Sequence, residues 1–392
     1  MKWIIKSASL LVMAAAMLAS CDEKAGPDSG SSIKIADLAI SFDKNVIIND
    51  GNDAVTLKAY YKGQDVSETA VLYREIPGKL VPEVMKSRRF ASTTVGQYTF
   101  KVGYNNAYSE DKAVITVTDM PLPKAADDPQ PESTSFVHRT FFNQYTAAGC
   151  QFCPGLTKLL RETLVGDVKD QVVLAAIRVN YGEELTFAAL PVPSGGQPYL
   201  DIDFKDTYQY NKSKEGLVEK INAITSNSAK VGISANPVYD AEKKKIVVRV
   251  AVKAAESGEY NVGLWLMQDN YYKVQTDGLG IIGSDKSYNY HHNGVRIAES
   301  LYAGSYTVGM PLGNLAEGET CERVFIFDIK DGIEKKKGKG GWWDSFTPEK
   351  LNDLHFAAFV TAPYTTSRGS RSYEVVNAID FPYNTPAPFD YK

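Results

Sequence analysis

The stretch 150–154, with sequence CQFCP, constrains the fold most, because it joins two opposite hydrophobic patterns. Residues 136–142 before it are rich in β-branched and aromatic side chains and predict a strand. After it, Pro154 suits a first helical turn, and leucines and a threonine recur at helical spacing: Leu156, Leu159, Leu160, Thr163 and Leu164. Both cysteines are therefore expected in a strand-to-helix turn, where the positive helix end favours thiolate over thiol.

The N-terminus predicts export and lipidation. Two lysines precede an apolar run, and the sequence LASC that ends at Cys21 resembles the lipobox of bacterial lipoproteins. Residues 1–20 are thus expected to be a lipoprotein signal peptide; an ordinary signal peptide with an incidental cysteine is the alternative. Residues 21–32 are charged and then rich in Gly, Ser and Pro, and predict a flexible tether. We expect an outer-membrane lipoprotein. The acidic residues after Cys21 resemble a surface-export signal, so we also expect exposure on the cell surface.

The flanking segments predict β structure. Residues 33–119 alternate between apolar and polar side chains around turn signals, and predict an immunoglobulin-like β-sandwich, with a spacer role or a binding role both open. Residues 120–133 carry four prolines and predict a semi-rigid linker. Residues 229–392 contain further strand patterns and predict a C-terminal β-sandwich domain.

The central segment, residues 134–228, resembles a thioredoxin-like α/β domain. A strand, a CxxC turn, a helix and the buried apolar run 171–179 follow one another as in the opening of that fold. The resemblance implies a cis-proline beside the disulfide, which would be Pro198. Ser213 is predicted to cap a helix that runs to about residue 224. Gly149 stands where thioredoxins usually carry tryptophan, and no buried acidic proton acceptor can be assigned, which argues against efficient redox turnover.

An ordered series of motifs carries a more specific resemblance. It comprises 146–154, 265–270, Gln275, 288–296, and the late pair 358–360 and 374–378. Together they resemble the family related to the twenty-eight-kilodalton outer-membrane protein of certain Gram-negative bacteria. The resemblance spans roughly residues 136 to 378 and implies a thioredoxin-like domain joined to a β-sandwich on an outer-membrane lipoprotein. It implies no biochemical activity.

Four interpretations compete for Cys150 and Cys153: a structural disulfide, a redox-active pair, a zinc site, or two reduced thiols. A disulfide that closes a four-residue loop removes unfolded-state entropy worth only about 1.9 kcal/mol, so it would stabilise the fold only weakly. In a redox role, Cys150 would attack, Cys153 would resolve and Pro198 would shape the substrate groove. A zinc site would need two further ligands. Cys321 is expected to be a half-buried free thiol, with a mixed disulfide as the alternative.

Two other features could contact ligands. His291 and His292 are adjacent, so in a strand they point to opposite faces and at most one joins a given site. A basic, Gly-rich segment, 334–343, ends in Trp342 and Trp343. We interpret it as a long hairpin, with contact to a glycan, a lipid headgroup or a protein partner as the alternative.

The net charge of the chain and the spacing of its reactive residues reduce the number of functions to consider. The chain has 43 Lys and Arg against 47 Asp and Glu, so no strong field indicates nucleic acid. We predict no metal and no cofactor. The predicted function is an envelope-anchored binding or structural lipoprotein, held to the membrane through Cys21, with a protein or glycan partner. The alternative is an extracytoplasmic thiol–disulfide oxidoreductase that uses Cys150 and Cys153. A hydrolase lacks a nucleophile–base–orienter spacing.

Overall fold

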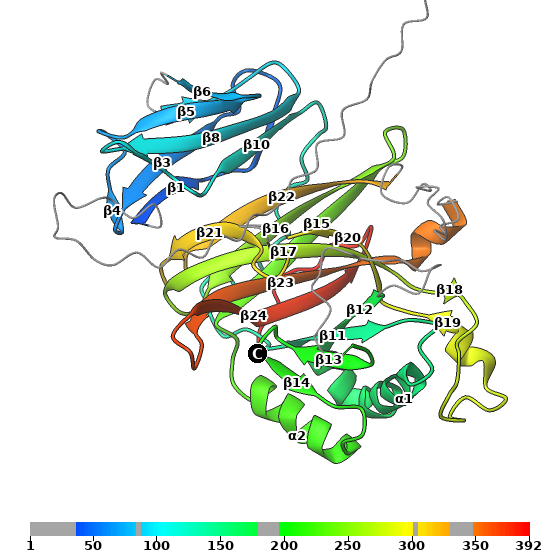
Figure 1. Cartoon of the computed structure of the whole chain (residues 1–392). Helices are drawn as coiled ribbons and strands as arrows, with labels where there is room; N and C mark the ends of the chain where they lie inside the picture. Colours follow the sequence, from blue (N-terminus) through cyan, green and yellow to red (C-terminus); the bar gives the residue numbers. More distant parts are fainter. Residues whose placement is uncertain (1–36, 84–87, 179–195, 301–304, 330–347) are drawn as a thin grey trace, which may run out of the picture.

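The computed structural model describes residues 37–83, 88–178, 196–300, 305–329 and 348–392. Cys21, Trp342 and Trp343 lie outside these residues, so their expected roles stay predictions. The expected β-rich architecture with several sheets is confirmed (Figure 1). In the part of the chain described, no helix combines the length and the apolar character needed to cross a membrane.

Residues 38–118 form a module of two sheets, blue to cyan in Figure 1. One sheet has the order β1-β3-β4 with β7 beside β3, and the other has β2-β10-β8-β5-β6 with β9 beside β8. Alternate side chains from both sheets fill one core, as the period-two pattern requires. The strands are β1 (Leu38–Phe42), β2 (Val46–Ile48), β3 (Val55–Tyr61), β4 (Gln64–Asp65), β5 (Val71–Ile76), β6 (Lys79–Pro82), β7 (Arg89–Phe90), β8 (Gly96–Tyr104), β9 (Ala107–Tyr108) and β10 (Ala113–Thr118).

The central segment holds the two α-helices of the described residues, and both cover one face of its sheet. Strand β11 is central, parallel to β12 and antiparallel to β13. The Ser213 side chain accepts a hydrogen bond from the Gly216 N–H at the start of α2, which confirms the predicted cap. The elements are β11 (Thr140–Thr146), α1 (Cys153–Thr163), η3 (Gly166–Gln171), β12 (Val172–Arg178), β13 (Tyr199–Ile202), β14 (Asp206–Tyr208) and α2 (Lys214–Thr225).

The strand predicted at 136–142 begins later, at Thr140. Phe136 instead makes isolated bridges to Ala229 and Tyr391. Its buried ring packs against Phe389 and Tyr391, two residues from the far end of the chain. A partner about 250 residues distant therefore takes this aromatic side chain away from β11.

One nine-stranded sheet crosses the expected domain boundary at residues 228 and 229. Its order is β14-β13-β11-β12-β20-β17-β23-β24, with β21 beside β17. The link between its halves is a single parallel bridge between Ala176 and Gly294. The additional strands are β17 (Gly258–Gln268), β20 (Gly294–Glu299), β21 (Met310–Leu315), β23 (Leu354–Thr365) and β24 (Arg371–Pro382). The two segments therefore share a sheet as well as a chain.

The C-terminal half of this sheet is buried on both faces. One face packs on the helix-free side of β11 and β12, around Phe141, Trp265 and Phe359. The other face packs on a three-stranded sheet of β15 (Val231–Asp240), β16 (Lys245–Ala254) and β22 (Thr320–Asp328). Smaller elements are β18 (Tyr271–Tyr272), η4 (Lys286–Asn289), β19 (Tyr290–His291) and η5 (Pro348–Asp353).

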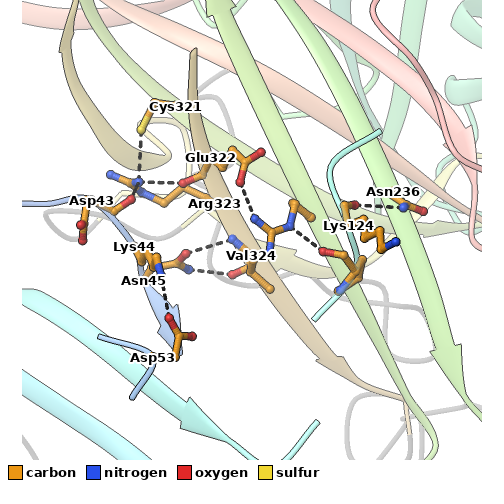
Figure 2. Close-up of polar contacts among 12 residues, drawn as sticks. Asp43, Lys44, Asn45, Asp53, Lys124, Asn236, Cys321, Glu322, Arg323 and Val324 are labelled. Carbon is orange, nitrogen blue, oxygen red and sulfur yellow. Dashed lines mark hydrogen bonds and ion pairs between the residues drawn. The ribbon is translucent and has the colours of Figure 1, made fainter. Parts of the chain in front are cut away.

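The N-terminal module is clamped to β22 (Figure 2). Asn45, 5% exposed, donates to the Val324 carbonyl at 2.6 Å and accepts from the Val324 N–H at 2.9 Å. The guanidinium of Arg323, 2% exposed, donates to the carbonyls of Phe42 and Asp43, both at 3.2 Å. Cys321 is a half-buried free thiol, as expected, with its Sγ 3.3 Å from Arg323 Nη1.

The expected linker also lies against the C-terminal sheets. Asn236 Nδ2 donates to the carbonyl of Lys124 at 3.0 Å, and Arg249 Nε donates to that of Pro123 at 2.6 Å. Met120 is buried in an apolar cluster with Val46, Val247 and Val324. These contacts fix the module in place.

The Asn45 clamp makes a stability prediction. Asn45→Ala leaves the buried N–H and C=O of Val324 without their partner, so we expect a loss of about 1–3 kcal/mol in the free energy of unfolding. Lys44→Ala is the control, because Lys44 is half exposed and pairs with Asp53 at 2.6 Å. That variant should lose less than about 1 kcal/mol. Urea denaturation measures both, and equal losses would mean that the clamp contributes no more than a surface ion pair.

Candidate functional site

The cysteine pair lies in the expected turn and is oxidised. Helix α1 begins at Cys153, with Pro154 in its first turn, and Cys150 precedes it by three residues. The Sγ atoms are 2.12 Å apart, so the pair forms a disulfide, which a structural pair and a redox-active pair would both do. Cys150 is 6% exposed and Cys153 is fully buried. An attacking thiol would therefore have little access to either sulfur.

A segment from the C-terminal half of the chain covers this turn. The Gln275 side-chain amide donates to the carbonyl oxygens of Ala148 at 2.9 Å and Cys150 at 3.0 Å. The Thr276 N–H donates to the Ala148 carbonyl at 2.7 Å, and the Gly278 N–H donates to that of Gln151 at 2.8 Å. The Gln275 amide also donates to the Ala147 carbonyl at 3.3 Å, so backbone and side chain together satisfy four carbonyl groups in and before the turn. Gln275 belongs to the motif series, and this is its structural role.

Gly278 is required for the close approach of this cover. A Cβ atom on Gly278 would lie 2.7 Å from the Cβ of Gln151, a distance that side chains do not tolerate. Only a residue without a side chain lets the two backbones meet here.

The acid–base environment does not support rapid redox chemistry. Gln144, at the cysteine end of β11, donates to Thr157 Oγ1 at 3.1 Å and cannot accept a proton from a thiol in the way a carboxylate can. The buried carboxylates Asp201 and Asp203 bond instead to Asn143 and to the Phe141 N–H, towards the opposite end of β11. Burial raises the pKa of Asp203 to about 7 and that of Asp201 to about 6.

The Gln197–Pro198 peptide bond is cis, as the fold resemblance implied. Pro198 immediately precedes β13, and Tyr199 of that strand is paired with Tyr145, next to the end of β11. Pro198 therefore lies at the same end of the sheet as the cysteine turn. Its role in shaping a substrate groove stays a prediction.

A groove of about 990 Å³ opens beside the covered turn. It is bounded by α1 and β12 on one side and by β24 and the C-terminal residues on the other. We call it the β12 groove. Its lining includes aliphatic side chains, Leu160, Leu164, Val172, Leu174 and Ile379, and aromatic ones, Tyr288, Tyr290 and Phe389. Its charged and histidine side chains are Arg139, Arg161, Lys169, Asp170, Arg178, Asp269, His291, His292, His355, Asp380 and Asp390.

A polar cluster forms one wall of the β12 groove. His355 Nδ1 lies 2.9 Å from Asp380 Oδ2, and its Nε2 lies 3.6 Å from Asp269 Oδ1, too far for a hydrogen bond but close enough for an ion pair. Burial lowers the pKa of His355, but the two carboxylates outweigh it and raise the pKa to about 9. Asp269 is also partly buried, yet His292 and His355 hold its pKa well below the usual range.

The two histidines singled out in the sequence behave differently. His291 is buried, with Nε2 3.0 Å from the Lys273 carbonyl, and burial together with the charge of Arg178 lowers its pKa to about 3. His292 is exposed and lies 3.5 Å from Asp269. Within the described ranges, no group of three His, Cys, Asp or Glu side chains has the geometry of a metal site.

Sequence reasoning missed His355 and Asp380. Each stands alone in its own segment, and only strand pairing brings them to Asp269: Met267 pairs with His355, and Ala357 pairs with Asp380. The one available signal was that 354–360 are predicted to form a strand, which says nothing about the strand's neighbours.

Comparisons with known proteins leave the family open. No family model matches the chain, and no curated protein matches it. Among solved structures, HBP35 of Porphyromonas gingivalis is similar at 16% identity and a TM-score of 0.48, over 65% of this chain and 78% of that one. A likeness this weak assigns no function. The resemblance to the family of the twenty-eight-kilodalton protein is not singled out by it and stays a prediction.

The His355 cluster predicts a pH dependence. Because the folded pKa of about 9 exceeds the unfolded value near 6.5, protonated His355 stabilises the fold below about pH 6.5. That stability, on the order of 3 kcal/mol, is lost as pH rises through about 9. His355→Gln should flatten the fall in unfolding free energy between pH 6.5 and 9.5, measured by denaturation at each pH. His292→Gln, 46% exposed, is the control. A slope unchanged in His355→Gln would contradict the assignment.

Proposed function

We propose that this chain is an envelope-anchored, surface-facing binding module on a thioredoxin-like scaffold, with an immunoglobulin-like module before it. The β12 groove, open beside a closed disulfide, is the observation that carries the proposal. The groove combines an aliphatic floor with walls rich in charged and histidine side chains, several of them held by ion pairs, so it offers both apolar and charged contacts to a ligand. The sandwich, clamped at Asn45 and Arg323, is held against the groove-bearing body.

An oxidoreductase is the less favoured alternative. Its nucleophile would be Cys150, which is 6% exposed and whose carbonyl is bonded by Gln275. Redox-active cysteines are accessible and titrate easily. The position below the turn is held by the amide of Gln144, which does not titrate. In this proposal the Cys150–Cys153 disulfide therefore has a structural role: it holds the conformation of the turn.

Anchoring follows from the lipobox-like sequence at Cys21. We expect the wild-type chain to incorporate radioactive palmitate and Cys21→Ala to incorporate none, because acylation requires that thiol. Protease treatment of intact cells then tests the outward orientation. Equal labelling of the two chains would remove the lipoprotein assignment.

The redox alternative has its own test. In the dithiothreitol-driven reduction of insulin, we expect the wild-type chain to give the rate of the protein-free blank, because its sulfurs are covered. A true oxidoreductase, used as the reference, accelerates the reaction. A clear acceleration by the wild type that Cys150→Ser abolishes would establish the enzyme instead.

The cover itself is tested in the same assay series. Gln275→Ala removes the amide that donates to the carbonyls of Ala147, Ala148 and Cys150, and each lost hydrogen bond is worth about 0.5–1.5 kcal/mol, so opening of the turn becomes easier. We expect dithiothreitol to reduce the Cys150–Cys153 disulfide about tenfold faster in this variant. Lys286→Ala, exposed on the same segment, is the matched control and should react as the wild type does. Equal rates in all three would mean that the cover does not restrict access.

A further inference from the structure

Strand β12 has one edge that is only partly paired. All seven of its residues pair with β11, but on the other side only Ala176 pairs, with Gly294. The Ala176 N–H donates to the Asn293 carbonyl at 2.7 Å, so the backbone groups of Ala176 face β20. Because backbone direction alternates along a strand, the N–H and C=O of Leu174 face the same side. In the described part of the chain, no strand pairs with this edge before Ala176.

This edge faces the β12 groove. Val172 and Leu174 line the groove and are partly exposed. The Val172 N–H is already bonded to the Lys169 carbonyl, which leaves the Val172 C=O and both backbone groups of Leu174 as the edge. An apolar floor below such an edge suits an added strand, whose alternate side chains would pack on Leu160 and Leu164. A strand advances about 3.3 Å per residue, so a short extended peptide fits beside it.

The charged side chains that line the groove determine which ligand charge it favours. Asp390 is paired with Arg139, and Asp269 and Asp380 both face His355. Among the described residues, no carboxylate forms an ion pair with Arg161 or with Lys169.

Arg161 donates to the Ser287 hydroxyl at 2.9 Å and stacks on the Tyr288 ring at 4.2 Å; Asp285 lies close enough to feel its charge but forms no ion pair with it. Against these two cations the lining offers one further exposed carboxylate, Asp170. The groove is therefore complementary to an acidic ligand.

We propose that the β12 groove binds an extended, acidic segment of a partner protein, which adds to β12 as a further strand. The inference rests on the proposed function as a binding module and names its ligand class. Main-chain hydrogen bonds to Leu174 and Val172 supply the register, and carboxylates of the segment meet Arg161 and Lys169. A glycan or a small apolar ligand would leave the backbone edge unused.

The test uses the full mature chain and a phage-displayed library of random dodecapeptides. We expect selected peptides to alternate apolar and polar residues and to carry Asp or Glu. Leu174→Pro removes the outward N–H and places the proline ring on the edge, while the bonds to β11 stay intact. Synthetic copies of the selected peptides should bind this variant at least about tenfold more weakly, the loss expected for one backbone hydrogen bond and its register.

Leu174→Ala keeps the N–H and is the matched comparison, with a smaller loss of affinity expected. Lys169→Glu should weaken binding further than Lys158→Glu, whose exposed position on α1 lies outside the groove lining. If Leu174→Pro fails to fold, amide exchange in the wild type decides the question: bound peptide should slow exchange at Leu174.

Three results would overturn the inference: no peptide selected, peptides that bind Leu174→Pro as well as the wild type, or unchanged exchange at Leu174. The proposed function fails separately. Insulin reduction by the wild type together with peptide protection at Leu174 would overturn the binding-only role and leave the peptide site in place.

Discussion

The packing of Phe141, Trp265 and Phe359 holds the two halves of the molecule together. Their ring centroids are 5.0–5.4 Å apart, and all three side chains are fully buried. Among the described residues, strand pairing joins the halves only at Ala176 and Gly294, and further backbone hydrogen bonds cross between them at Thr276 and Gly278 and at Val375, so this buried side-chain packing adds to a modest set of backbone contacts. Because β20 pairs with β12 only at Ala176, the edge of β12 before that residue has no neighbouring strand among the described residues, and the β12 groove opens there. The same aromatic cluster thus holds the two halves together and sets the position of the β12 groove.

That cluster also explains the state of the cysteine turn. By holding β17 near β11, it brings the segment after β17 over the turn, where Gln275 meets the carbonyls of Ala148 and Cys150. In an exposed turn those carbonyls would bond to water, and a disulfide beside them would be open to exchange. Here protein groups take the place of that water. The two cysteines of the turn are thereby buried, while Gln151 and Phe152 between them stay exposed.

Two buried cations, His355 and Arg323, hold together segments that are distant in the sequence. His355 lies between two carboxylates from neighbouring strands and stays protonated at neutral pH, because its pKa is raised to about 9. It neutralises two acids in the wall of the groove, which would otherwise repel the acidic segment that we propose as its ligand. On the opposite side of the C-terminal sheets, Arg323 is buried against carbonyls of the N-terminal module, which explains why that module is held closely. Both sites use a buried cation to join segments distant in sequence.

The features that could be predicted from the sequence alone are those that depend on interactions between residues close together in the chain. The helix after the cysteine turn, the Ser213 cap and the alternating strands depend on residues a few positions apart, and each lies close to where the pattern predicts. The sheet shared across residue 229 depended on contacts across about 120 residues, which no local pattern encodes. The same holds for the meeting of Asp269, His355 and Asp380 and for the late start of β11. Packing in three dimensions decided these, because strand pairing and aromatic burial select partners by shape and not by nearness in the chain.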